Sequence, residues 1–85
     1  MNWRLEWRER AIQDTERLDR RTRERILAAL ERLAESNYGD VIPLRGRDRE
    51  WRLRVGQWRV LLTYDYDVGS IIVLRVLPRG SAYRQ

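Results

Sequence analysis

The 85-residue sequence contains no cysteine, no histidine and no lysine, so arginine supplies all 18 of its cationic side chains. Without cysteine there is neither a disulfide nor thiol chemistry, and the usual zinc ligands are missing as well. We therefore expect no metal and no other cofactor. No apolar run approaches the ~18 residues of a membrane-spanning helix, and the chain opens on an alternating segment instead of a signal peptide, so we expect a cytoplasmic protein.

The charge of the chain is unevenly distributed. Residues 1–40 hold 9 Arg and 9 Asp or Glu, whereas residues 41–85 hold 9 Arg and 4 Asp or Glu, so the formal net charge of +5 belongs to the second half. A one-sided basic distribution suggests a polyanionic partner, and nucleic acid fits better than a membrane surface or an acidic protein. The alternative is a solvated basic face without a ligand.

The most informative segment is residues 51–59, where apolar residues alternate with arginines. Alternation predicts a strand, and Gly56-Gln57 predicts a two-residue hairpin turn with glycine at the position that needs positive φ. This turn fixes the register of the two strands. We expect these opposed pairs: Val55 with Trp58, Arg54 with Arg59, Leu53 with Val60, Arg52 with Leu61 and Trp51 with Leu62. Facing arginines on an exposed sheet face repel, so an anion is expected to lie across them.

The remaining elements follow from periodicity and capping. We predict a strand at residues 3–7, a helix at 11–18, an edge piece at 41–44, and strands at 58–66 and 71–77. Asp19 is the expected N-cap of a second, longer helix that ends at residues 36–39. Its apolar stripe is Ile26, Leu27, Leu30, Leu33 and Ala34. The prediction is one α+β domain over residues 1–85, of order β-α-α-β-β-β, in which a two-helix hairpin packs on a small, mainly antiparallel twisted sheet.

The two faces of the sheet are expected to differ. Alternation in the last strand directs Ile72, Leu74 and Val76 toward the helices. It leaves five arginines on one open concavity: Arg52, Arg54, Arg59, Arg75 and Arg79. Their planar forks suit phosphate. The four tryptophans fall in the apolar phase of their strands, which favours packing in the core over base stacking. Tyr83 lies beyond the last strand, where packing and function are equally open.

The chain resembles the RelE/ParE toxins of type II toxin–antitoxin systems in four features: the element order, Leu-Asp-Arg at residues 18–20, Trp-Arg-Leu-Arg-Val-Gly-Gln-Trp-Arg-Val at 51–60, and Val-Leu-Pro-Arg-Gly-Ser-Ala-Tyr-Arg at 76–84. The resemblance covers nearly the whole chain and implies a RelE-like fold. For RelE-like members it implies cleavage of mRNA in the ribosomal A site. There the 2′-hydroxyl attacks the adjacent phosphate and leaves a 2′,3′-cyclic phosphate and a free 5′-hydroxyl.

The resemblance also implies roles for particular residues. The catalytic set is Arg52, Arg54, Arg59, Arg79 and Tyr83, and further contacts to nucleic acid are predicted for Arg45, Arg47, Arg75 and Arg84. Arginine forks can stabilise the negative charge of a phosphoryl transition state. Arginine does not readily lose a proton, so Arg52 and Arg54 are poor general bases, and Tyr83 is the better candidate. Arg79 would assist the leaving oxygen.

A toxin of this kind implies three partners: a cognate antitoxin, the ribosome and mRNA, with no membrane and with a toxin–antitoxin hetero-oligomer. We expect an acidic helix or extended tail of the antitoxin to cover the arginine concavity. The hairpin pattern is shared by members that inhibit DNA gyrase, so a ParE-like gyrase inhibitor and a binding-only relative stay open. The spacing of Arg79 and Tyr83 favours the ribonuclease, because ParE-like proteins usually lack that pair.

Overall fold

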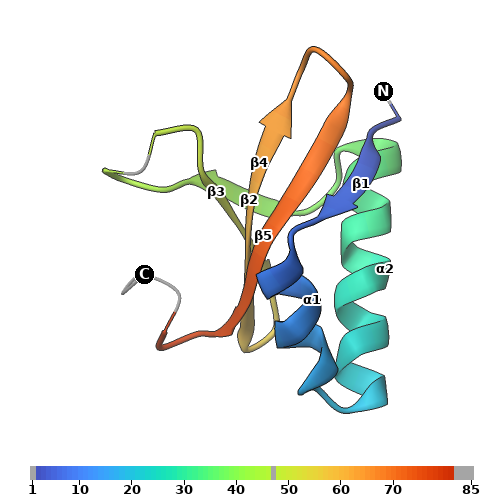
Figure 1. The fold of residues 1–85 in the computed structure, drawn as a ribbon, viewed down its shortest axis with the longest axis vertical. Coiled ribbons are helices and arrows are strands. Elements are labelled where there is room, and N and C mark those ends of the chain that lie inside the picture. Colours follow the sequence, from blue (N-terminus) through green and yellow to red (C-terminus); the bar gives the residue numbers. More distant parts are fainter. Residues whose placement is uncertain (1, 47, 82–85) are drawn as a thin grey trace.

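The fold of the chain is given by a computed structural model that describes residues 2–46 and 48–81 (Figure 1). The elements in chain order are β1 (Arg4–Trp7), α1 (Glu9–Glu16), α2 (Arg20–Ser36), β2 (Asp40–Pro43), β3 (Trp51–Val55), β4 (Trp58–Asp65) and β5 (Ser70–Pro78). Both helices lie together on one side of the sheet (Figure 1). The α+β prediction is confirmed, and the expected edge piece forms strand β2.

The sheet has five strands in the order β1-β5-β4-β3-β2. Strand β1 runs parallel to β5, and the other neighbours are antiparallel. All five pairs predicted for the β3–β4 hairpin are confirmed. Gly56 has a φ of +57°, and a Cβ there would lie 3.0 Å from Nη2 of Arg25. Glycine is therefore favoured at this turn by its backbone conformation, whereas the end of the exposed Arg25 side chain could move aside for a Cβ.

Local signals set the ends of α2. The side chain of Asp19 accepts a hydrogen bond from the backbone N–H of Thr22, which confirms the predicted N-cap. At the other end Asn37 takes the left-handed conformation with a φ of 57°, and its N–H donates to the carbonyl of Leu33. Such a C-cap stops the helix and turns the chain toward β2.

The hydrophobic core lies between the helices and the sheet. Its fully buried members include Ile26, Leu30, Leu53 and Val60, and all four tryptophans are partly buried against it. The prediction that the tryptophans pack in the core is confirmed. Leu27 was expected in the buried stripe of α2, but it is 41% exposed. That expectation is wrong because Leu27 lies at the margin of a stripe centred on Ile26 and Leu30, about 100° per residue around the helix.

A β-bulge changes the faces of β5. Leu61 pairs with Arg75 and Leu62 with Val73, so Leu74 is an extra residue in the ladder. Before the bulge, Ile71 and Val73 join the core against the helices, and after it Val76 does. The prediction that Ile72 and Leu74 face the helices is therefore wrong. It assumed unbroken alternation, whereas one extra residue shifts the phase by one position.

Trp51 supports the side of the core nearest the β2–β3 loop. It packs against the core, and its ring lies 5.7 Å from that of Tyr64 in an edge-on arrangement. We expect Trp51→Ala to lower the free energy of unfolding by about 3 kcal/mol, the lower end for a truncated aromatic because the ring is partly exposed. Urea unfolding checks this value. Tyr38→Ala, at a side chain that is 69% exposed, is the control and should change stability little.

Candidate nucleic-acid interface

The sheet face that points away from the helices carries the predicted arginines of the hairpin. Leu53 and Val60 belong to the core on the helix side. Their neighbours Arg52, Arg54 and Arg59 therefore lie on the opposite face, and we call these three side chains the arginine face. A small apolar cluster lies on the same side of the sheet: Leu61 and Leu77, with Leu44 and Leu74 packed against them.

The three members of the arginine face have different surroundings. Nε of Arg54 lies 2.7 Å from Oδ2 of Asp40 on the neighbouring strand β2, and Nη1 of Arg52 lies 3.9 Å from Oδ1 of the same carboxylate. The Arg54 side chain is 57% exposed, but that of Arg52 is only 12% exposed. Asp40 therefore partly neutralises two arginines at once and holds them together.

Arg59 is buried, with 8% of its surface exposed. Its Nη1 donates hydrogen bonds to the carbonyl oxygens of Gly56 and Trp58, each at 2.9 Å. The expectation that Arg54 and Arg59 oppose each other on an exposed face is thus wrong for Arg59, although the register is as predicted. Its guanidinium turns back onto the hairpin, where carbonyl dipoles stabilise the charge and separate it from Arg54.

Two of these arginines have hydrogen-bonding capacity left over. Nε and Nη1 of Arg52 and Nε of Arg59 are buried and have no hydrogen-bond partner among the described residues. A buried donor without an acceptor costs about 1–3 kcal/mol, and more when it is charged. An oxyanion, such as a phosphate oxygen or a carboxylate, would supply the missing acceptor. The arginine face is therefore suited to bind an anion.

Two of the other predicted site residues, Arg79 and Arg45, lie in described segments outside the strands. Arg79 is exposed just after β5, and its backbone N–H donates to the carbonyl of Gln57 at 2.9 Å, which holds it beside the hairpin turn. Arg45 is exposed in the loop between β2 and β3. Arg47, Tyr83 and Arg84 lie outside the described residues. The structure thus brings Arg79 near the arginine face through the turn.

Arg75 makes a contact that the sequence did not indicate. Its Nε and Nη2 donate to the two carboxylate oxygens of Asp14 at 2.9 and 3.2 Å, and the N–H of Val76 donates to the same carboxylate at 2.8 Å. Burial alone would raise the pKa of Asp14, but the hydrogen bonds from Arg75 and Val76 outweigh it, so the pKa lies below its ordinary value. Arg75 was expected on the same sheet face as Arg52, and the register agrees, because Leu61 pairs with both Arg52 and Arg75. Its guanidinium is nevertheless bound to Asp14 and ties β5 to α1.

The reason lies at the edge of the sheet. Strand β1 ends at Trp7, which pairs with Val73, so the rest of β5 has no strand on that side. Helix α1 lies against this free edge, and Asp14 accepts the N–H of Val76 that a strand would otherwise have bound. A buried backbone donor needs such an acceptor.

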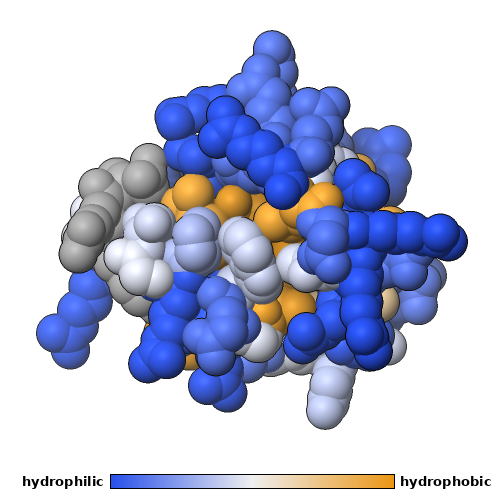
Figure 2. Space-filling model, turned by 90° about the horizontal axis from the view of Figure 1, so that it is seen from below, coloured by the Kyte–Doolittle hydropathy of each residue, from blue (hydrophilic) through white to orange (hydrophobic). Residues whose placement is uncertain are grey.

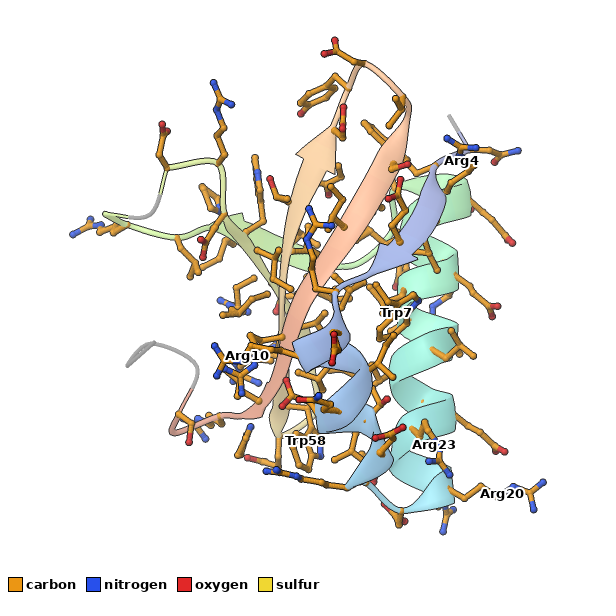
Figure 3. All side chains as sticks on the ribbon, viewed as in Figure 1. Arg4, Trp7, Arg10, Arg20, Arg23 and Trp58 are labelled. Carbon is orange, nitrogen blue, oxygen red and sulfur yellow. The ribbon has the colours of Figure 1, made fainter. Side chains whose placement is uncertain are left out.

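Helix α1 also supplies basic residues that sequence analysis missed. Arg8, the N-cap of α1, and Arg10 line a hollow that also contains Glu9, Glu50, Leu61, Leu74 and Arg75. Figure 3 shows Arg10 extending from α1 toward β5. They were missed because the first half of the chain has no net charge when it is counted as a whole. A helical wheel would have placed Arg10 one turn before Asp14, but the contact with the sheet is visible only in the fold.

Carboxylates gather around a different hollow. Asp48, Asp65 and Asp67 line it together with the rings of Trp51 and Tyr66. Most of the acidic side chains in the basic half of the sequence are thus kept away from the arginine face. Asp40 is the carboxylate that pairs with Arg52 and Arg54 there.

Residues 5–83 match the family described as the ParE toxin of the type II toxin–antitoxin system parDE. The match spans nearly the whole chain, so this protein belongs to that family and is a type II toxin of the RelE/ParE superfamily. A search of curated proteins finds no relative. None of the helices in the described part of the chain is long and apolar enough to cross a membrane.

Solved structures with the same fold include RelE toxins and a YoeB/ParE toxin. The toxin of the archaeal RelE–RelB complex from Pyrococcus horikoshii OT3 is 25% identical, with a TM-score of 0.78, and the match covers 96% of this chain and 100% of that one. A toxin variant of RelE from E. coli in the free state is 23% identical with a TM-score of 0.77, covering 96% and 88%. The YoeB/ParE toxin from Agrobacterium tumefaciens is 20% identical with a TM-score of 0.75, covering 88% and 96%. The RelE-like fold is thereby established.

Proposed function

We propose that this toxin is a ribosome-dependent mRNA endoribonuclease that inhibits translation. The observation that supports this best is the set of buried donors of Arg52 and Arg59 that have no acceptor within the described residues. A scissile phosphate on the arginine face would satisfy them once the two guanidinium groups turn outward to meet it. Since the face is shallow, the ribosome would supply the in-line geometry of the substrate.

The proposed reaction needs charge stabilisation and two proton transfers. Tyr83 takes the proton of the 2′-hydroxyl, which attacks the adjacent phosphorus. The bond to the 5′-oxygen breaks, and that oxygen receives a proton from water as the cyclic phosphate is left behind. Arg52 and Arg59 stabilise the non-bridging oxygens, and Arg79 stabilises the leaving oxygen. Each such contact is typically worth about 2–4 kcal/mol in the transition state.

The proposed partner in the resting cell is a cognate antitoxin. Relatives with this fold are crystallised with RelB antitoxins. We expect acidic residues of the antitoxin to meet Arg52, Arg54 or Arg59, because the same donors that suit phosphate suit carboxylate. The pair within the chain supports this, since Oδ2 of Asp40 lies 2.7 Å from Nε of Arg54. Co-expression of this antitoxin should relieve growth arrest.

A second candidate function is inhibition of DNA gyrase, which the match to the ParE family over residues 5–83 favours. The deciding experiment is translation of a defined mRNA in vitro with the toxin added, followed by primer extension, beside a gyrase supercoiling assay. New 5′ ends inside the message with normal supercoiling support the ribonuclease. Intact mRNA with blocked supercoiling contradicts the ribonuclease and supports inhibition of DNA gyrase.

Tyr83→Phe tests the proposed general base. It removes only the hydroxyl, so we expect cleavage on programmed ribosomes to fall by on the order of 10²-fold or more while the fold is retained. Single-turnover primer extension measures the rate. Tyr38→Phe is the matched control, since Tyr38 is 69% exposed between α2 and β2, and it should cleave like wild type. Wild-type cleavage by Tyr83→Phe would remove Tyr83 from the mechanism.

A further inference from the structure

Five exposed arginines lie where α1 ends and α2 begins. We call them the arginine corner: Arg17, Arg20, Arg21, Arg23 and Arg25. Two carboxylates lie within the same segment, and both have local partners. Asp19 accepts the N–H of Thr22 as the helix N-cap, and Glu24 lies 3.0 Å from Nε of Arg20. The corner therefore keeps a clear excess of positive charge.

The physics of helix α2 does not explain this cluster. The N-terminus of a helix carries a partial positive charge and favours acidic residues, yet the first turn of α2 contains none. Arg20 and Arg23 are three residues apart, and Arg21 and Arg25 are four apart, so both pairs place like charges side by side on the helix surface. The arrangement is unfavourable for the isolated fold and becomes favourable when an anion lies across it.

The arginine corner adjoins the arginine face through the β3–β4 turn. Nη2 of Arg25 lies 3.0 Å from the position of a Cβ on Gly56, and Nη1 of Arg59 donates to the carbonyl of the same glycine. Figure 3 shows Arg20 and Arg23 directed outward at the same end of the molecule as Trp58. Viewed onto that end, hydrophilic side chains cover both sides of a strip of apolar ones (Figure 2).

We propose that the arginine corner is a second surface for nucleic acid and binds the phosphodiester backbone of a duplex. Residues 17–25 contain no aromatic side chain, so they offer no platform on which unpaired bases could stack. Arginines on a rigid helix end suit the fixed phosphate spacing of a duplex instead. The surface does not depend on the proposed cleavage, because a helix of ribosomal RNA and a segment of duplex DNA present the same backbone chemistry.

The test compares two variants with the same change of charge. Arg21→Gln/Arg23→Gln removes two members of the corner, and Arg4→Gln/Arg49→Gln removes two exposed arginines elsewhere. Arg49 lies in the loop between β2 and β3, and Arg4 lies at the opposite end of the molecule from the corner (Figure 3). Binding of a labelled RNA duplex and of a DNA duplex of the same sequence is measured by fluorescence anisotropy over a range of salt. Each lost phosphate contact should reduce the slope of log K against log salt by about 0.9 on DNA.

We expect the corner variant to lose roughly tenfold or more in affinity at low salt, with a salt slope smaller by about 2, and the control variant to lose much less. The melting temperature of the corner variant should equal or exceed that of wild type, because like charges on α2 are removed. Arg21→Gln alone serves if the double variant binds too weakly to measure. A larger loss on RNA assigns the surface to an RNA helix, such as one of ribosomal RNA. A larger loss on DNA assigns it to duplex DNA, such as the DNA bound by gyrase. Equal losses in corner and control variants overturn the proposal.

The measurement involves neither a ribosome nor cleavage, so it can fail or succeed independently of the ribonuclease. Arg54→Gln separates the two further. If this variant loses cleavage but binds the duplexes within about twofold of wild type, the two surfaces are distinct. If it loses duplex binding as fully as the corner variant, the corner and the arginine face form one continuous surface, and the proposal of a second, separate surface is overturned.

Discussion

Arg52→Met should abolish most mRNA cleavage and at the same time make the toxin more stable. The Arg52 side chain is only 12% exposed, its Nε and Nη1 lack hydrogen-bond partners within the described residues, and its carboxylate neighbour is 3.9 Å away. Methionine has a similar length without polar atoms, so we expect the free energy of unfolding to rise by about 1 kcal/mol. Loss of a transition-state contact of about 2–4 kcal/mol lowers the cleavage rate by on the order of 30- to 10³-fold.

Arg54→Met is the matched control on the same strand. The Arg54 side chain is 57% exposed and pairs with Asp40, so its replacement should change stability by no more than about 0.5 kcal/mol. Urea unfolding and primer extension on programmed ribosomes give the two values for each variant. Destabilisation by Arg52→Met would mean that the arginine is structural, and unchanged cleavage would remove it from the proposed site.

Asp14→Ala should be the most damaging change of a single polar residue. The carboxylate accepts three hydrogen bonds, from Nε and Nη2 of Arg75 and from the N–H of Val76, and it is 11% exposed. Its removal leaves a largely buried guanidinium and a backbone donor without this acceptor. We expect a loss of about 3 kcal/mol in unfolding free energy, below the full value of a completely buried pair.

Glu9→Ala, at an exposed position of the same helix, is the control and should have little effect. Asp14→Ala/Arg75→Met should recover part of the loss, because the largely buried guanidinium that has lost its Asp14 acceptor is removed as well. The pH dependence gives an independent check. The pKa of Asp14 is lowered from its ordinary value of 3.8, so its stabilisation is complete above that pH and disappears as the pH falls through the lower value in the folded state. A difference between wild type and Asp14→Ala that persists unchanged in strong acid would contradict this account.

Much of the fold could be predicted because its signals are local. Alternation in residues 51–59 together with Gly56 gave the hairpin and its register, and Asp19 gave the start of α2. The order of elements follows from such segments taken one at a time. The candidate site was predicted in outline for the same reason, since alternation alone places Arg52, Arg54 and Arg59 on the face away from the core.

The bulge was not predictable in this way. An extra residue at Leu74 changes the phase of β5, yet Ile71, Ile72, Val73 and Leu74 form a continuous apolar run in which either alternate set could face the helices. Apolar residues on both faces carry no information about register. The choice depends on how β5 pairs with both β4 and β1, which is a property of the assembled sheet.

What the sequence determined by itself is therefore the set of elements, the hairpin register and the basic character of one sheet face, because backbone preference and alternation act over a few residues. The tertiary structure alone decided which arginines remain available. It bound Arg75 to Asp14, 61 residues away, turned Arg59 onto the hairpin carbonyls, and brought Arg8 and Arg10 beside the sheet. A guanidinium binds whichever acceptor the fold brings within reach, and that acceptor is fixed by which strand edges and carbonyls remain uncovered once the helices have packed.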